Sequence, residues 1–323
     1  MKRKTTAAIG IVLLCAIGAA SQIPYGGGGG NGMASVSASN ALIAAAPSQS
    51  PSKRLTESII QQAIDRTVQA GGGDVTIPAG KYYVEKTIVV KPSVTLRLNS
   101  GATLIPVRNV NVIELRSNSA VSGGVIYAYG NENFDKSAVY LDGSEGFSGT
   151  LKSASISDLK IIGPPGRGNG LFFYAAKEDD HVSWVQVTNL NITGFEKSIH
   201  LKTEAVREPD KIWINGNNFS QIQIKDSTYG IYIDGHRDLP YEISGNQFTN
   251  VQIQTNDNMK QAIYVKGTKN IFQAMIWDYH RGTVAVRFDE DSYRNQIQSN
   301  VSSRDPAYQD FGRNNLNLSP EDN

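Results

Sequence analysis

The chain has 323 residues, 40% of them hydrophobic, which suits one large domain or two small ones. Its 31 basic and 30 acidic side chains give a formal net charge of +1 at pH 7. This balance argues against nucleic acid or an anionic membrane as a partner, because both require a strongly basic face.

The first twenty residues have the pattern of a secretory signal peptide. A basic head at residues 2–4 precedes an apolar stretch at residues 7–17, and Gly18 and Ala20 are the small residues expected before a cut. This apolar stretch is too short to span a membrane, and no later segment approaches 18 apolar residues. We therefore expect a secreted, extracellular bacterial protein with residues 1–20 removed, which changes the net charge from +1 to −2.

Residues 21–52 are rich in Gly, Ser and Ala, which is typical of a flexible linker. The folded domain is predicted to begin near Lys53 with a helix that Thr56 caps and the glycines at 71–73 end. The apolar residues that share one face of this helix are Ile60, Ala63, Ile64 and Val68.

A five-residue pattern then recurs six times, at intervals of 28 or 32 residues and finally 23. Each copy alternates between apolar and other side chains, which is the period of a strand with one buried face. A repeat of this length cannot bury its own apolar face, so the copies must stack on their neighbours in a solenoid. The copies are VYLDG at 139–143, LFFYA at 171–175, IHLKT at 199–203, IYIDG at 231–235, IYVKG at 263–267 and VRFDE at 286–290.

Two further strand families lie between these copies, which gives three short strands per coil. Phe219 and Phe248 stand at equivalent places and are predicted to stack inside the solenoid. We therefore predict an all-β chain, a parallel β-helix over residues 53–302 whose open end the N-terminal helix caps, followed by a polar tail at 303–323. One family has copies at 159–161, 190–192, 222–224, 251–253 and 274–276, and the other at 184–187, 212–216, 241–245 and 295–298.

The run IIQQAIDRTVQAGGGDVTIPAGKYYVEKTIVVKPSVTLRLNSGATLIP at 59–106 resembles the N-terminal motif of the pectate-lyase-like superfamily. The resemblance implies a right-handed parallel β-helix and a secreted protein whose partner is polysaccharide, as a monomer or, as in phage tailspikes, a homotrimer. Members include polysaccharide lyases, glycoside hydrolases, epimerases and tailspikes. The motifs typical of polygalacturonases and classical pectate lyases are missing here, so no catalytic residue is transferred.

If the first residue of each repeated pattern points inward, the second and fourth point outward. Adjacent coils lie about 4.8 Å apart, so the outward side chains form two parallel rows. Aromatic rings beside charged groups suit a sugar chain, because rings stack on apolar sugar faces and charges bind hydroxyls or carboxylates. The two rows are Tyr140, Phe172, His200, Tyr232, Tyr264 and Arg287, and Asp142, Tyr174, Lys202, Asp234, Lys266 and Asp289.

Two reactions can be drawn on these rows. Elimination from a uronic acid needs a base, for which His200, Lys202 and Tyr232 are candidates, and a cation that neutralises the uronate carboxylate. Inverting hydrolysis would use Asp234 and Asp289, roughly 9–10 Å apart if they lie two coils apart. The candidate cations are Arg237, Lys266 and Arg287, and the residues predicted to bind substrate are Tyr140, Asp142, Phe172, Tyr174, Tyr264 and Lys266.

We expect a polysaccharide lyase first, an inverting glycoside hydrolase second, and a non-catalytic glycan-binding or surface-structural solenoid as the alternative class. No cofactor is expected, because neither reaction requires a metal; Ca²⁺ stays open as an alternative, although the carboxylates are too dispersed to predict a site for it. A second face remains an alternative location for the site. Its outward residues are Lys160, Asn191, Gln223, Gln252 and Met275.

Overall fold

A computed structural model describes residues 41–42, 55–149, 151–205, 211–236, 242–279 and 283–321 of the chain. All of these belong to one compact unit, Ala38–Asn323. The predicted signal peptide and almost all of the predicted linker lie outside the described residues. No helix among the described residues is long and apolar enough to cross a membrane.

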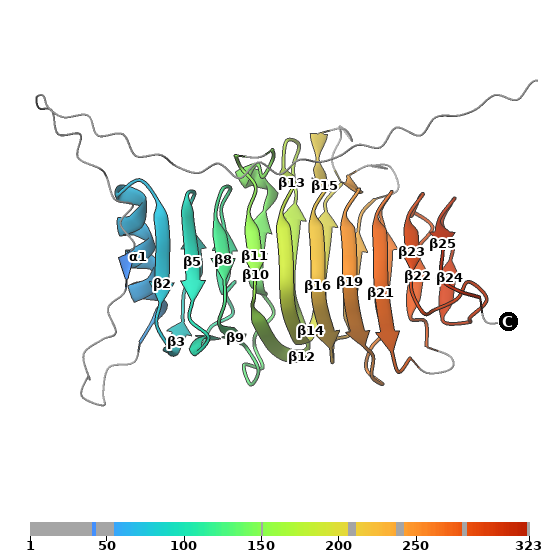
Figure 1. Cartoon of the computed structure of the whole chain (residues 1–323), viewed down its shortest axis with the longest axis horizontal. Coiled ribbons are helices and arrows are strands. Elements are labelled where there is room, and N and C mark those ends of the chain that lie inside the picture. Colours follow the sequence, from blue (N-terminus) through green and yellow to red (C-terminus); the bar gives the residue numbers. More distant parts are fainter. Residues whose placement is uncertain are drawn as a thin grey trace, which may run out of the picture. The chain divides into compact units, whose positions relative to one another are not determined.

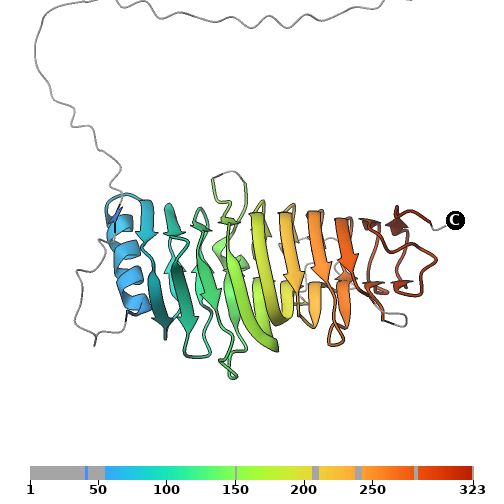
Figure 2. The same cartoon turned by 60° about the horizontal axis from the view of Figure 1, so that its bottom comes forward.

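The described residues wind into a right-handed parallel β-helix, whose coils lie side by side in Figures 1 and 2. Three long parallel ladders of strands run along it, here called ladders A, B and C. The predicted fold class is confirmed, because every pair of neighbouring strands in these ladders is parallel, and register shifts occur only between β12 and β14 and between β19 and β21.

The strands fall into the ladders as follows. Ladder A contains β1 (Ala41–Leu42), β2 (Gly73–Ile77), β5 (Val94–Leu98), β8 (Ala120–Ser122), β11 (Ser155–Ser157), β23 (Gln296–Gln298) and β25 (Leu316–Asn317). Ladder B contains β3 (Gly80–Val84), β6 (Ala102–Pro106) and β9 (Val125–Tyr127). Ladder C contains β4 (Ile88–Val90), β7 (Ile113–Leu115), β10 (Ser137–Asp142), β17 (Tyr229–Asp234), β20 (Gln261–Lys266), β22 (Val286–Phe288) and β24 (Tyr308–Asp310).

Five long strands turn a corner and so belong to more than one ladder. They are β12 (Lys160–Ala175) in B and C, β14 (Gln186–Thr203) in all three, and β16 (Asn218–Lys225), β19 (Gln247–Gln254) and β21 (Ile271–Trp277) in A and B. A short fourth sheet consists of β13 (His181–Ser183), β15 (Trp213–Asn215) and β18 (Ile243–Ser244), and a 3₁₀ turn spans Gly143–Glu145.

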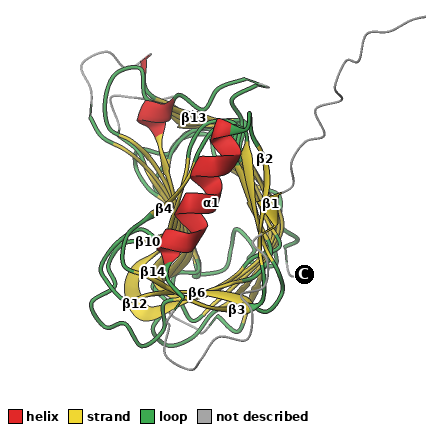
Figure 3. Cartoon of the chain, turned by 90° about the vertical axis from the view of Figure 1, so that its left-hand side faces the viewer, coloured by secondary structure: helices red, strands yellow, loops and turns green. Residues whose placement is uncertain are grey.

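Helix α1 (Glu57–Gln69) lies across the first coil, as the view along the axis shows (Figure 3). Its buried face contains Ile60, Ala63 and Ile64 as predicted, but Thr67 completes it, while Val68 is 36% exposed. Thr56 is the N-cap residue, yet its hydroxyl contacts the Ser58 hydroxyl at 2.7 Å and makes no capping bond to the backbone. The helix covers the open strand edge and the core, which explains why the solenoid can begin here.

The interior is a continuous apolar core of stacked rows. Phe219, Phe248 and Phe272 occupy successive coils with their rings parallel, at centroid distances of 4.5 and 5.1 Å. All three rings are buried. The predicted interior stacking of Phe219 and Phe248 is therefore confirmed, and one further coil continues it.

A row of asparagines forms the polar part of the interior, at the corner between the fourth sheet and ladder A. From Asn246 onward, each side-chain oxygen accepts from the backbone N–H and the Nδ2 of the asparagine one coil earlier, at 2.9–3.2 Å. Along most of the row, Nδ2 also donates to a backbone carbonyl of the fourth sheet or the turn after ladder C. These buried amides are paired on both sides and hold the corner rigid. The row, called the asparagine ladder below, consists of Asn217, Asn246, Asn270, Asn295 and Asn315.

One strand family expected from the sequence is divided between two sheets in the structure. The strand family with copies at 184–187 and 295–298 belongs largely to ladder A, whereas the copies at 212–216 and 241–245 belong to the fourth sheet. The two sheets are divided by a left-handed corner residue, such as Trp184 (φ 63°) or Gly245 (φ 64°). Because a tryptophan rarely adopts this conformation, the corner at Trp184 could not be predicted from the sequence.

The boundaries of the β-helix are also wider than predicted. The segment after Ser302 is not a separate tail, because β24 pairs with β22 and β25 pairs with β23. At the other end, β1 falls within the predicted linker and pairs with β2. Both short segments satisfy backbone groups at the ends of the ladders and so extend the sheet beyond the sequence repeat.

Candidate functional site

The outward face of ladder C carries the two rows that the repeat predicts. Tyr140, Phe172 and His200 are neighbours across adjacent strands, and the row continues through Tyr232, Tyr264 and Arg287. The second row is in register from Asp142 to Lys266, and the backbone N–H of Asp289 donates to the Val265 carbonyl in the preceding coil. The structure thus brings these side chains together on one face, here called the ladder C face. Arg237 lies outside the described residues.

The aromatic rings of the ladder C face stack on one another along the solenoid axis. Phe172 lies parallel to His200, with ring centroids 4.6 Å apart, and Tyr232 lies parallel to Tyr264, also at 4.6 Å. Since each ring covers the face of its neighbour, these faces are not open to a sugar ring. These two stacked pairs therefore argue against sugars stacking on the faces that the rings turn toward each other.

His200 is buried within this row, with 7% of its surface exposed. Its Nδ1 contacts the Asn169 Oδ1 at 3.0 Å, and its Nε2 is buried without a hydrogen-bond partner. Burial, reinforced by the charges of Lys197 and Lys202, lowers the pKa of His200 to about 2. The ring therefore remains neutral and is a poor acceptor for a substrate proton, which argues against His200 as the base.

The tyrosines of the ladder C face are proton donors. Burial raises the pKa of Tyr232, and the charge of Asp234 raises it further. Burial also raises the pKa of Tyr264, and there the hydrogen bond to Asp289 adds to the effect. The Tyr264 hydroxyl donates to the Asp289 Oδ2 at 2.9 Å, and the Tyr140 hydroxyl to the Asp142 Oδ2 at 3.1 Å. A phenol whose pKa is raised stays protonated at neutral pH, so Tyr232 suits the role of acid better than that of base.

Asp234 stands in the charged row between two lysines. Its neighbours across the ladder are Lys202 on one side and Lys266 on the other, about 4.8 Å away along the axis. A hydrogen bond from the Lys202 Nζ to the Glu204 Oε1, 2.7 Å long, raises the pKa of Lys202, and the charge of Asp234 contributes further. Lys202 is therefore a cation and not the base that the sequence also allowed.

Asp289 and Arg287 form a separate group at the next coils. The Arg287 guanidinium lies 4.9 Å from the Phe311 ring and 3.4 Å from the Asp289 carboxylate. The same carboxylate accepts from the Tyr264 hydroxyl and from the backbone N–H of Glu290. Its oxygens are occupied by protein donors, so Asp289 is poorly placed to give a proton to a glycosidic oxygen.

Phe172, Tyr174 and Asp142 mark the other end of the face. The Tyr174 hydroxyl donates to the Glu204 Oε1 at 3.2 Å, and the Asp142 carboxylate accepts from the backbone N–H of Ser144. The first contact joins Tyr174 to the following coil, and the second lies within the coil of Asp142. The part of the face with the fewest internal bonds is therefore around Asp234 and Lys266, for which no ion pair occurs among the described residues.

The second face considered from the sequence is the outward side of ladder B. Asn191, Gln223, Gln252 and Met275 form one row in register, with Lys160 at its start. Two adjoining hollows lie over its last coils, of about 660 and 390 Å³, and both are lined by Gln252 and Trp277. Sequence reasoning missed Trp277, which follows Met275 in the same strand and points to the same side.

No family model and no curated protein matches the chain. Among solved structures, the chain is similar to ORF18 of Geobacillus virus E2, at 14% identity and a TM-score of 0.47, over 81% of this chain and 57% of that one. It is also similar to the A-module of the Azotobacter vinelandii mannuronan C-5 epimerase AlgE6, at 11% identity and a TM-score of 0.35, over 83% and 96% of the two chains. A third is the tailspike gp49 of Acinetobacter baumannii bacteriophage Fri1, a capsular polysaccharide depolymerase, at 13% identity and a TM-score of 0.35, over 82% and 55%.

The strand ladders themselves confirm the fold that the sequence resemblance implies, a parallel β-helix. The chain spans little more than half the length of the viral ORF18 protein and of the tailspike. At these identities a common fold carries no reaction with it, so function has to be argued from the side chains of the two faces.

Proposed function

We propose that this protein is an extracellular carbohydrate-active protein that cleaves an acidic, uronate-containing polysaccharide by β-elimination on the ladder C face. The observation that carries the proposal is the row Lys202–Asp234–Lys266, in which one carboxylate stands between two cations beside protonated tyrosines. Elimination requires these groups together: a base for the proton, a positive charge for the uronate carboxylate and an acid for the leaving oxygen.

Each group has one role in the proposed reaction. The Asp234 carboxylate takes the C5 proton of the uronate, and the electron pair of that bond forms the C4–C5 double bond. The Lys266 ammonium, with Lys202, neutralises the uronate carboxylate and stabilises the charge that develops as the proton leaves. The bond from C4 to the glycosidic oxygen breaks, and the Tyr232 hydroxyl donates its proton to that oxygen.

The test is a substrate panel with the full-length protein. Pectate, alginate, hyaluronan and neutral glycans are incubated with it, and two products are followed: the ultraviolet absorbance of an unsaturated uronate, and new reducing ends. Elimination is expected to give both signals with one of the acidic polymers. Reducing ends without the absorbance would establish hydrolysis instead, and the absence of both would contradict an enzymatic function.

Variants then test the residues. We expect Asp234→Asn to reduce the rate about 10²- to 10⁴-fold, since the general base is removed while the shape is kept. Lys266→Gln should chiefly slow the chemical step, because it removes the charge opposite the uronate. Asp158→Asn and Lys152→Gln are the matched controls on other parts of the surface and should retain full activity. Full activity in Asp234→Asn would refute the assignment.

A further inference from the structure

The larger hollow over the last coils of ladder B lies where the corner between ladders A and B becomes shorter. In the coils of β16 and β19 a left-handed corner residue, Gln221 or Asn250, separates ladder A from ladder B. Strand β21 lacks this residue: Phe272 pairs with Phe248, but Ala274 already pairs with Val251, and the register shifts between them. The corner between ladders A and B is thus one residue shorter in this coil than in the two preceding coils.

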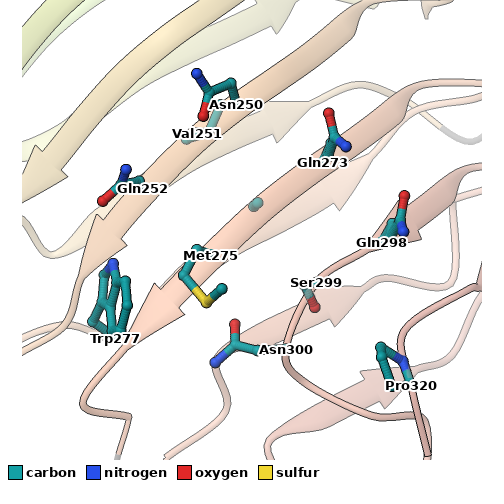
Figure 4. A pocket seen from close by; sticks show the side chains of 11 residues that line it. Asn250, Val251, Gln252, Gln273, Met275, Trp277, Gln298, Ser299, Asn300 and Pro320 are labelled. Carbon is teal, nitrogen blue, oxygen red and sulfur yellow. The ribbon is translucent and has the colours of Figure 1, made fainter.

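Two further features deepen the hollow. The small Ala274 occupies the place that Ile222 and Val251 fill in the preceding coils, and it is 8% exposed where they are fully covered. Ladder B also ends at β21 among the described residues, whereas ladders A and C continue for two more strands each. Together these features leave a hollow of about 660 Å³ bordered by β19, β21 and β23 (Figure 4).

The lining of the hollow is uncharged. The larger hollow has amide, hydroxyl and apolar side chains and no ionisable group, and the adjoining hollow of about 390 Å³ adds only Lys225. Because both include Gln252 and Trp277, they form one groove across successive coils, here called the amide groove. This contrasts with the alternating charges of the ladder C face, so the two surfaces suit ligands of different charge.

The amide groove holds polar groups that the protein does not use. Among the hydrogen bonds of the described residues, none involves the side-chain amides of Gln223, Gln252, Gln273 or Gln298. Trp277 is 45% exposed and Met275 40% exposed, and Figure 4 shows both on the same strand beside the amides. An amide offers a donor and an acceptor to neighbouring hydroxyls, and an exposed indole offers a face for an apolar sugar surface.

A peptide strand does not fit this place, since the edge of β21 is already occupied. The Asn300 side chain accepts from the Ile276 N–H and donates to the Ile276 carbonyl, each at 2.8 Å, so these backbone groups are not available for strand addition. The ligand must be recognised through side chains alone. Hydroxyl groups arrayed along a chain match amides that recur coil by coil.

We propose that the amide groove is a second binding site, which takes an uncharged oligosaccharide segment, with Trp277 as the stacking platform and Gln252 and Gln273 as the hydroxyl-binding amides. The site is separate from the ladder C face and does not require the reaction proposed there. Binding should be insensitive to salt, because no charge pair forms.

The experiment measures binding directly, without turnover. Cellohexaose, maltohexaose, laminarihexaose and N-acetylchitohexaose are titrated into the full-length protein while tryptophan fluorescence is followed, with a galacturonate hexamer as the charged comparator. One of the neutral hexamers is expected to saturate with a fluorescence change and an affinity that stays constant between low and high salt. Gln252→Ala should weaken it several-fold, and Trp277→Ala at least about tenfold, by calorimetry.

Trp184→Ala is the matched control, because Trp184 is also exposed, at 56%, but stands at the corner before ladder A. Its affinity should equal that of the unchanged protein. The proposal is overturned if no neutral hexamer saturates up to about 10 mM, if only the galacturonate hexamer binds, or if Trp277→Ala and Gln252→Ala bind as well as the control. Since the neutral hexamers contain no uronate and are not substrates of the proposed elimination, failure of that reaction leaves their binding unaffected.

Discussion

The asparagine ladder should be the most sensitive polar element of the fold, and Asn246 is its best test. The Asn246 oxygen accepts from the backbone N–H and the Nδ2 of Asn217, at 3.2 and 2.9 Å. Its own Nδ2 donates to the Ile214 carbonyl and to the Asn270 Oδ1, both at 3.0 Å. Asn246→Leu keeps the approximate size of the side chain but removes all four bonds in a fully buried place.

At about 1 kcal/mol for each of the four buried hydrogen bonds, plus about 1–3 kcal/mol for leaving the Asn217 N–H unpaired, the loss should be about 5–7 kcal/mol. Urea unfolding followed by circular dichroism measures it through the midpoint, with the slope unchanged. Asn191→Leu, at an exposed position in ladder B, is the matched control and should change stability by less than about 0.5 kcal/mol.

A second variant separates the two halves of the amide. Asn246→Asp retains both acceptor bonds to Asn217 but removes both donor bonds, so it should also destabilise the fold near neutral pH. If Asn246→Leu remained within about 1 kcal/mol of the unchanged protein, the ladder would contribute no net stability and the reasoning from its hydrogen bonds would be wrong.

Three other predictions concern buried positions. Phe248→Ala removes the middle ring of a buried stack and should cost about 3–5 kcal/mol, seen as a lowered thermal midpoint. Burial lowers the pKa of His200 to about 2, so below pH ~6.5 the unfolded chain binds a proton on this ring while the folded chain does not, and the free energy of unfolding falls on acidification. His200→Phe should abolish about 2 kcal/mol of the stability lost between pH 7 and pH 5. Urea unfolding of both proteins at pH 7 and at pH 5 measures this difference. Gly194→Ala should unfold the protein at a much lower urea concentration than Gly146→Ala, since both have positive φ but only at Gly194 would the new Cβ stand 2.3 Å from a carbonyl oxygen, that of Gly163. Equal midpoints for the two glycine variants would contradict this steric argument.

The ladders of this fold were predictable because they follow a strict alternation. The inward residues of the repeat had to be aliphatic or aromatic for coils to stack, and Val139, Leu171 and Ile199 align in the structure as they do in the sequence. The corner at Trp184 was not predictable, since the left-handed conformation there is imposed by neighbouring coils against the preference of the residue. Local sequence specifies the period of the strands and not each turn between them.

The candidate sites show the same division. The row on the ladder C face could be predicted by spacing, but whether its rings present faces or edges depends on packing between coils, as the parallel pair Tyr232 and Tyr264 shows. One sequence feature could have predicted the amide groove, but the sequence analysis did not use it. The interval from the interior phenylalanine to the next strand is three residues at Phe219 and Phe248 but two at Phe272, and the larger hollow lies at this shorter corner.

Because each coil is bonded only to the coils before and after it, the resistance of the solenoid to force depends on the direction in which it is pulled. Backbone hydrogen bonds run along its axis, so tension between its ends loads the interfaces between coils in series, and the weakest opens first. Helix α1 protects the first coil, whereas the coil of β24 and β25 has ladder partners on one side only among the described residues. Stretched by its ends, the protein should unwind from that coil inward, each repeat of 28 or 32 residues releasing about 100 Å of chain.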